Sequence, residues 1–150
     1  MSDSHEMQHL SDIILSQMED SPQQQRSRVR IRRALEAAEQ LLSEGGPEAC
    51  SIPEVAKAAD VPRAAIYRYF PDRPALLAAM AAASMDQLGE VIRKTIQELP
   101  RASSEGVLEV AVVETVRFFN DEPVASILQF NGPFGVVDRK THHQKSGLLI

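Results

Sequence analysis

The chain has 150 residues, enough for one domain or two small units, and 39 of them are Leu, Ile, Val or Phe, enough for a hydrophobic core. Its one cysteine, Cys50, excludes an internal disulfide and a cysteine-based zinc site. No apolar run approaches the about 20 residues that cross a bilayer, and the short apolar stretch at 13–15 lacks the basic flank of a secretory signal. We therefore expect a cytoplasmic protein without a membrane partner.

The formal net charge of −5 is distributed unevenly along the chain. Residues 1–20 hold five acidic side chains and no Lys or Arg, residues 21–75 carry a net +2, and residues 76–150 a net −2. Five central arginines fall within eight positions: Arg26, Arg28, Arg30, Arg32 and Arg33. Because a polyanion responds to local charge, the acidic total does not exclude a nucleic-acid partner.

Helical spacing of apolar residues dominates the sequence, and strand-like alternation is absent. Residues 1–25 form an acidic extension in which Met7, Leu10, Ile14 and Met18 have the spacing of a narrow apolar stripe. A mobile tail and an added short helix are equal alternatives for this extension. The first strongly predicted helix has its apolar face from Ile31 onward and ends at Gly45-Gly46-Pro47.

Two short helices are predicted next. Ser51-Ile52-Pro53-Glu54 is typical of a capping box, in which the Ser hydroxyl accepts a backbone N–H and the Glu side chain reaches back to another. This helix ends near Asp60, and a shorter one begins at Pro62 and ends before Pro71.

Longer helices are predicted in the rest of the chain. Asp72 caps a helix that continues to Leu99, where Pro100 ends it. Two more are expected at about 105–120 and 123–130, followed by a weakly amphipathic stretch at 136–146. The predicted fold class is all-α, with an extension at 1–25, a first domain at 26–72 and a second helical domain at 73–150.

The two short helices and their connection fit a helix-turn-helix. Small Ala56 lets the second helix cross closely, and apolar Val61 fills the turn. Asp60 falls where a left-handed backbone is needed, and Asp is among the few residues other than Gly that adopt it.

Over about residues 30–78 the chain carries a series of characteristic segments in a fixed order. They are Ala34-Leu35-Glu36-Ala37-Ala38-Glu39-Gln40-Leu41-Leu42, Gly46, Ser51-Ile52-Pro53-Glu54-Val55-Ala56, Ala59-Asp60-Val61, Ile66-Tyr67-Arg68-Tyr69-Phe70, Arg73 and Leu76-Leu77, and they align with a known family pattern without gaps. This set resembles the DNA-binding domain of TetR-type transcriptional regulators. The chain departs from the family pattern, which usually has Gly at Asp60, Ser at Pro62, Gly-Thr at Ala64-Ala65 and Lys at Arg73. The lost hydroxyls remove two phosphate contacts and the usual cap of the recognition helix.

The resemblance implies a set of DNA-contacting residues: Ser51, Arg63, Ala64, Ala65, Tyr67, Arg68, Tyr69 and Arg73. Arg63 and Arg68 would recognise guanine edges or grip phosphates, with solvated surface charge as the alternative. Tyr67 would donate its hydroxyl to a phosphate, whereas Tyr69 is expected to pack with its hydroxyl at the rim. Ala64 and Ala65 either touch thymine methyl groups or serve as helix formers.

Two further basic features are assigned weaker roles. Arg73 would lie near a phosphate at the positive end of its helix. We expect the arginine run at 26–33 to be a solvent-exposed segment that leads into the first predicted helix. It would attract phosphates to some extent and would not recognise bases.

Catalytic signals are absent from the sequence. Cys50 has no base that the sequence places near it and is interpreted as a partly buried structural cysteine. The adjacent His142 and His143 would point about 100° apart on a helix, which makes a poor chelating pair. We expect no enzymatic activity, no metal and no cofactor.

The resemblance implies that the second domain binds an effector and dimerises. Eight residues are candidates for an apolar pocket, with plain core packing as the alternative: Met80, Met85, Leu88, Ile92, Phe118, Phe119, Phe130 and Phe134. Arg117 is the only cation expected to face inward, so the effector would be small, apolar and poor in negative charge. Family members usually continue through two further long helices that form the dimer, so the chain is either a fragment or builds its dimer differently.

The favoured hypothesis is a ligand-responsive repressor that binds a palindromic double-stranded DNA operator as a homodimer. The alternative is an interaction module that keeps the fold with weakened or lost operator binding.

Overall fold

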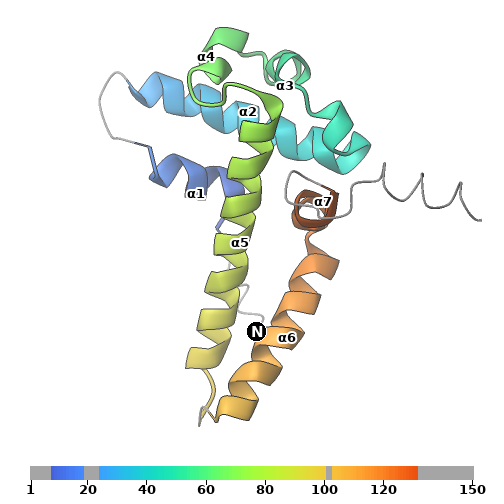
Figure 1. Cartoon of the computed structure of the whole chain (residues 1–150). Coiled ribbons are helices and arrows are strands. Elements are labelled where there is room, and N and C mark those ends of the chain that lie inside the picture. The colour runs from blue at the N-terminus through green and yellow to red at the C-terminus, as the bar shows by residue number, and fades with distance from the viewer. Residues whose placement is uncertain (1–7, 19–23, 101–102, 132–150) are drawn as a thin grey trace, which may run out of the picture.

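The computed structural model describes residues 8–18, 24–100 and 103–131, and within them it contains helices and no strand (Figure 1). The elements are α1 (Leu10–Ser16), α2 (Gln24–Gly45), the 3-10 helix η1 (Pro47–Ala49), α3 (Ile52–Ala59), α4 (Arg63–Tyr67), α5 (Arg73–Gln97), α6 (Ser104–Asp121) and α7 (Pro123–Asn131). The all-α prediction is confirmed. The predicted stretch at 136–146 lies outside the described residues.

The long helix α5 organises the molecule (Figure 1). Helices α2, α3 and α4 gather at its N-terminal end, α1 packs on both α2 and α5, and α6 runs back along α5 to α7. Asp72 starts α5 as predicted, because its Oδ1 accepts the N–H of Ala75 at 2.8 Å.

Helix α2 begins earlier than the apolar pattern predicts, at Gln24 instead of Ile31. The arginine run is therefore part of the helix. The apolar pattern marks only the buried half of α2, whereas Arg is a good helix former that continues the helix without burial.

For residues 1–25 the sequence left a mobile tail and an added short helix as alternatives. The structure shows the added helix, α1, within this segment. Leu10 and Ile14 of the predicted stripe are buried, and Met18 packs against the same core, while Met7 lies outside the described residues. The amide of Gln87 donates to the backbone oxygen of Gln8 at 2.5 Å, which fixes the start of this segment on α5.

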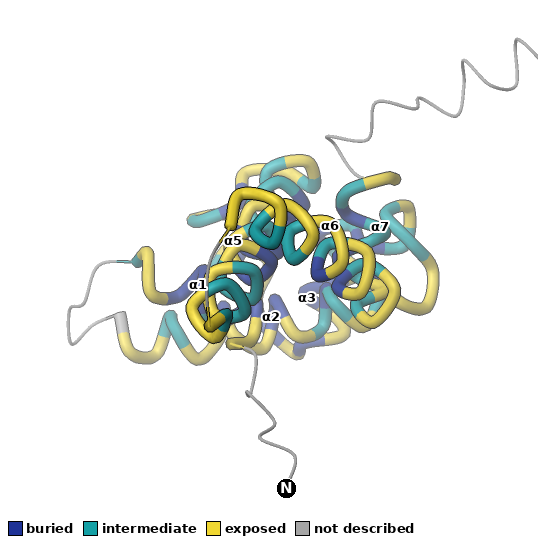
Figure 2. The backbone as a smooth tube through the Cα atoms, turned by 90° about the horizontal axis from the view of Figure 1, so that it is seen from below, coloured by how far each residue is buried: buried dark blue, intermediate teal, exposed yellow. Residues whose placement is uncertain are grey.

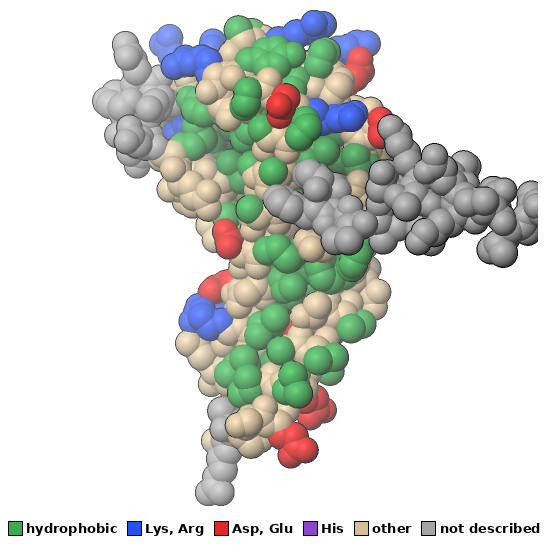
Figure 3. Space-filling model, in the orientation of Figure 1, with side chains coloured by type: hydrophobic (Ala, Val, Ile, Leu, Met, Phe, Trp, Pro, Cys, Tyr) green, Lys and Arg blue, Asp and Glu red, His purple; other side chains and the backbone are tan. Residues whose placement is uncertain are grey.

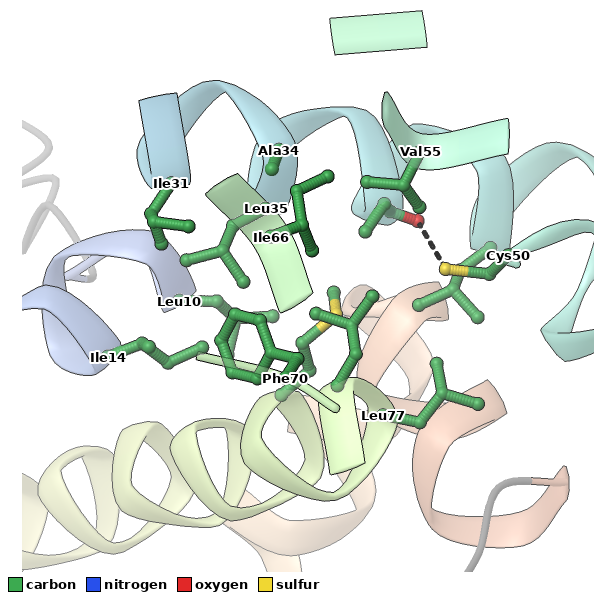
Figure 4. Close-up of a cluster of buried hydrophobic side chains, with 14 of the residues drawn as sticks. Leu10, Ile14, Ile31, Ala34, Leu35, Cys50, Val55, Ile66, Phe70 and Leu77 are labelled. Carbon is green, nitrogen blue, oxygen red and sulfur yellow. Dashed lines mark hydrogen bonds between the residues drawn. The ribbon is translucent and has the colours of Figure 1, made fainter. Parts of the chain in front are cut away.

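The main core lies where α1 to α5 meet (Figure 4). Its central side chains have no exposed surface: Ile31, Leu35, Leu42, Val55, Ile66, Leu76 and Met80. A smaller second cluster joins Leu88 of α5 to Phe118 of α6 and Ala125 of α7. Figure 2 shows buried segments turned inward and exposed segments on the outer turns.

Among the described residues, α5 is the one helix long and apolar enough to cross a membrane, by length and composition alone. A core helix passes the same test, so this feature is weak evidence for a span. Its buried residues face α1, α6 and α7.

Candidate nucleic-acid interface

The turn between α3 and α4 has a defined backbone geometry. Asp60 is left-handed at φ 52°, ψ 54°, as predicted. The N–H of Val61 donates to Ala56 O at 3.0 Å and the N–H of Asp60 to Lys57 O at 3.3 Å, the two bonds of a Schellman motif. Val61 and Ala56 are both buried, so the apolar contact typical of this motif closes the turn.

Helix α3 starts at the predicted position with one of the two bonds of the predicted capping box, since the observed cap involves the Ser51 hydroxyl and not the Glu54 side chain. The Oγ of Ser51 accepts the N–H of Glu54 at 3.3 Å, and Pro53 lies in the first turn. The Ser51 hydroxyl thus has a structural partner, and its proposed contact with DNA stays a prediction.

Helix α4 is only five residues long, and its two faces differ. Ile66 has no exposed surface and anchors the helix to the core, where half-buried Ala65 and Tyr69 also pack. The packing predicted for Tyr69 is therefore confirmed. The opposite face carries exposed Arg63, Ala64, Tyr67 and Arg68, with Tyr67 45% exposed.

The start of α4 lacks a side-chain cap. Pro62 occupies the N-cap position at φ −58° and offers no hydroxyl. In the first turn of α4, the N–H of Ala65 donates to the backbone oxygen of Pro62 at 3.0 Å.

The arginine run of α2 divides between two faces. Arg28 Nη1 donates to Met18 O at 3.4 Å, and Arg32 Nη1 pairs with Asp12 Oδ1 at 2.5 Å, so both lie toward α1 and its flank. Arg30 instead lies beside α4. This division follows from helical geometry, since positions four apart share a face and positions two apart do not.

A hollow of about 220 Å³ lies between α2 and α4. It is lined by Ser27, Arg30, Pro62, Ala64, Ala65 and Arg68. Two arginines from different helices thus border one concave surface, which we call the α2–α4 groove. Lys and Arg side chains gather over this end of the molecule in Figure 3.

The sequence predicted some phosphate attraction for the whole arginine run, but it did not single out Arg30 or Ser27. The signal was present as the spacing of Arg26, Arg30 and Arg33, which are four and three residues apart on one helical face. This spacing defines a helical face only if the helix includes residues 26–30, whereas the apolar pattern predicted a helix from Ile31.

A second, shallower hollow covers α3 and the turn. It carries Lys57 and Arg63 but also acidic Glu54 and Asp60. The mixed charge makes this surface a poorer match for a phosphate backbone than the α2–α4 groove.

Arg73 is engaged within the chain. Its Nη1 donates to Pro47 O at 3.5 Å and lies 3.6 Å from Glu48 Oε2, so the half-buried guanidinium holds η1 to the start of α5. The phosphate contact expected of Arg73 stays a prediction, and it would compete with these bonds.

The candidate effector residues are divided by the structure. Met85, Leu88, Ile92, Phe118 and Phe119 share the second cluster. Met80 belongs to the main core instead, and Phe130 is 56% exposed with its ring 5.3 Å from that of Phe119. Phe134 lies outside the described residues.

The expectation that Arg117 faces inward is wrong. Its side chain is 61% exposed and pairs with Glu114 Oε1 at 2.8 Å on the same helix. The guanidinium reaches back to the largely buried carboxylate of Glu114 while staying hydrated itself, and full burial would remove that hydration.

Cys50 is a buried structural cysteine. Its Sγ donates to Ala38 O at 3.8 Å, and burial raises the pKa of the thiol to about 11 (Figure 4). The thiol is therefore protonated near neutral pH and is a poor nucleophile. In the part of the chain that the structure describes, no group of three or more His, Cys, Asp or Glu side chains is placed to hold a metal.

Comparison with known proteins adds independent findings. Residues 34–80 match the family described as bacterial regulatory proteins, tetR family, which confirms the resemblance seen over about 30–78. Two relatives from Mycobacterium tuberculosis are the uncharacterized HTH-type transcriptional regulators MT1294 (strain CDC 1551 / Oshkosh) and Rv1255c (strain ATCC 25618 / H37Rv). Each is 34% identical over 98 residues, which cover 65% of this chain and 48% of the relative. The chain thus spans about half the length of the curated relatives it matches.

Proposed function

We propose that the protein is a cytoplasmic transcriptional repressor of the TetR type, because its residues 34–80 match the model of the tetR family of bacterial regulatory proteins. It binds a palindromic double-stranded DNA operator as a homodimer and releases it when a small apolar effector binds. In this proposal residues 26–72 contact DNA, and residues 73–150 bind the effector and the second copy.

The observation that carries the proposal is the exposed face of α4 beside an arginine of α2. Arg63 and Tyr67 are exposed on α4, and Arg30 of α2 borders the neighbouring α2–α4 groove together with Arg68. A recognition helix places its first residues at base edges while neighbouring cations contact phosphates. The exposed side of α4 supports base recognition by Arg63, and the α2–α4 groove supports phosphate contact by Arg30 and Arg68.

The second copy would cover α6. Four of its residues form an exposed apolar stripe: Leu108, Val112, Val113 and Val116. If two copies pair antiparallel about Val112, Leu108 of one copy lies opposite Val116 of the other, and Arg117 lies near the acidic start of the other helix. A two-fold pairing of this kind is self-complementary in shape and charge.

The effector would enter the second cluster between α5, α6 and α7. Half-buried Met85, Ile92 and Phe119 surround buried Leu88 and Phe118, so an apolar ligand would replace contacts between these side chains. Because α5 also carries core residues Leu76 and Leu77 at its other end, a shift of α5 would move the DNA-binding helices.

A mobility-shift titration on the DNA upstream of the protein's own gene tests the proposal. We expect a retarded band with that duplex, weaker binding to a scrambled duplex of equal length, and affinity that falls steeply with added salt. Half-sites are expected about 34 Å apart. Failure to bind any duplex at low salt would reject the proposal and favour the interaction module that keeps the fold.

A further inference from the structure

Ser27 of α2 has surroundings that set it apart from the other serines of the described segments. Several of those serines are buried or already bonded: Ser11, Ser16, Ser51, Ser84 and Ser103. Ser27 is half-buried instead, and it lines the α2–α4 groove together with Arg30 and Arg68. It thus borders a concave surface that carries cations.

The charge on this groove is positive and is not compensated within it. Arg30 and Arg68 give the lining a formal charge of +2, and none of the lining residues is acidic. In the described segments no carboxylate lies within salt-bridge distance of either guanidinium group. Both side chains are exposed, so they can turn toward an anion without breaking an ion pair. The groove therefore favours a small anionic group.

A phosphate ester on Ser27 would lie within reach of both arginines. Arg30 is three residues further along α2 on the same helical face, and Arg68 borders the groove from the end of α4. The groove has a volume of about 220 Å³. Three phosphoryl oxygens, each of about the size of a water molecule, need roughly 90 Å³. The group fits between the two guanidinium groups.

The start of α2 can open without loss of the core. Residues 25–30 include no buried side chain, and Ile31 is the first buried residue after them. Opening these turns breaks the bonds of Arg28, among them the one to Met18 O, but exposes no core residue. Such local opening lets a modifying enzyme bind the segment around Ser27 in an extended form.

We propose that Ser27 is a phosphorylation site and that its phosphate closes the α2–α4 groove to DNA. A serine kinase supplies the phosphoryl group from ATP and Mg²⁺. The Oγ of Ser27 attacks the γ-phosphorus, the bond from that phosphorus to the β–γ bridging oxygen breaks, ADP leaves, and a base of the kinase takes the hydroxyl proton. The product carries a charge of about −1.5 to −2 at pH 7, which offsets the formal +2 of the groove.

The two parts of this proposal depend on different premises. The closure of the groove rests on the proposed function, because a DNA phosphate would occupy the same place. The docking of the Ser27 phosphate between Arg30 and Arg68 requires no DNA. Each part therefore has its own measurement.

The full chain with phosphoserine placed at position 27 by genetic code expansion tests the docking. The matched control carries phosphoserine at position 43, where an exposed serine lies 16 residues further along the same helix, roughly 24 Å away. We expect the ³¹P resonance at position 27 to titrate at lower pH than that at position 43, because two cations stabilise the dianion. Equal titration midpoints at the two positions overturn the proposal.

Arginine variants of the protein with phosphoserine at position 27 locate the phosphate. Arg68→Ala should raise the pH of the titration midpoint, because it removes one of the two cations. Arg63→Ala, which removes an exposed arginine of α4 outside the groove, should leave the midpoint unchanged. Equal effects of the two substitutions contradict the assignment.

Fluorescence anisotropy with a DNA duplex at low salt tests the closure. Phosphoserine at position 27 should weaken binding at least about tenfold and lower the salt slope by about two released ions, whereas phosphoserine at position 43 should change the affinity less than about twofold. Equal affinities of the unmodified chain and the chain with phosphoserine at position 27 overturn the closure. If the unmodified chain binds no duplex, the proposed function fails and the closure fails with it, while the ³¹P titration still decides whether the phosphate docks. Should phosphoserine at position 27 unfold the chain by circular dichroism, Ser27→Asp decides, because its single negative charge should give a smaller loss in the same direction.

A kinase specific for serines flanked by arginines tests access to the site. Arg26 and Arg28 flank Ser27. We expect tandem mass spectrometry to find phosphate on Ser27 both in the folded full chain and in a synthetic peptide of residues 22–34, and Ser27→Ala to remove it. Phosphorylation of the peptide but not of the folded chain overturns the proposal, because the start of α2 would then not open to the enzyme.

Discussion

The two ends of α5 are built differently, although both carry well-formed helices. At the N-terminal end, Leu35, Val55 and Ile66 are fully buried in a core that α1, α5 and α7 complete around α2, α3 and α4. At the other end, α6 buries only Glu114 and Phe118 and leaves its apolar stripe exposed. Most of the α6 backbone is accordingly coloured as exposed or intermediate in Figure 2.

Local helix signals do not explain this difference. Ser51 caps α3, and Ser103 caps α6 in the same way, accepting the N–H of Gly106 at 3.1 Å. What differs is tertiary packing. The comparison teaches that α2–α4 are closed into a core by other helices of the same chain, whereas α6 presents a surface that the proposed second copy would cover.

The largest expected effect is on stability. Ile66→Ala removes a fully buried side chain that anchors α4, and we expect it to lower the free energy of unfolding by about 2–5 kcal/mol. Leu108→Ala is the matched control on α6, where the side chain is 66% exposed in a single copy and the expected change is under about 0.5 kcal/mol at protein concentrations too low for pairing. Urea denaturation measures both. Similar costs at the two sites would show that the two ends of α5 are equally packed.

The next effect concerns DNA binding. Arg63→Ala should cost about 1–3 kcal/mol of binding free energy and relax preference at one base pair, because a bidentate contact to guanine is lost. Arg93→Ala, which removes an exposed arginine of α5 away from α4, should leave binding unchanged. Competition assays against single-base operator variants measure both quantities.

Tyr67→Phe refines the same test. Removing the phenol oxygen keeps the ring in place. The substitution should lower the affinity for all duplexes by a similar factor, as expected for a phosphate contact. If Tyr67→Phe changes base preference while Arg63→Ala weakens all sequences equally, α4 is docked differently from this account.

Alkaline pH should act through Cys50. Its pKa is raised to about 11 in the folded protein, above the about 8.5 of an unfolded thiol. The neutral buried thiol thus contributes stability that is fully present below pH about 8.5 and is lost as the pH rises to 11, by roughly 3 kcal/mol. Urea denaturation across this range should show a smaller loss for Cys50→Ala than for the unchanged protein. Parallel losses would mean that the thiol does not titrate differently on folding.

The smallest effect separates the two serine caps. Ser51→Ala should lower the free energy of unfolding by about 1 kcal/mol, because α3 belongs to the cooperative core. Ser103→Ala should mainly speed hydrogen exchange in the first turn of α6, with a smaller global effect. A larger global loss from Ser103→Ala would reverse the comparison.

The sequence was sufficient where local chemistry decides the structure. The cap at Ser51, the left-handed Asp60 and the start of α5 at Asp72 each depend on a residue whose side chain or backbone preference acts within a few positions. The helical fold and the family resemblance followed from the same signals.

The sequence was insufficient where distant segments meet. It left α1 undecided, because a seven-residue helix is stable only through packing on α2 and α5. It did not separate Arg30 from Arg32, since their different surroundings come from α4 and α1. The inward position expected of Arg117 failed because helical periodicity alone did not show which face of α6 would be covered.

The most direct test of the proposed interface compares two arginines that are two residues apart. Arg30 borders the α2–α4 groove, whereas Arg32 pairs with Asp12 on the opposite side. Fluorescence anisotropy with an operator duplex over a range of salt concentrations should show that Arg30→Ala weakens binding and lowers the salt slope by about one released ion. Arg32→Ala should leave both unchanged, because its surface ion pair contributes little to stability. Equal effects of the two substitutions, or a larger effect of Arg32→Ala, would contradict the assignment of the α2–α4 groove as the DNA-binding surface.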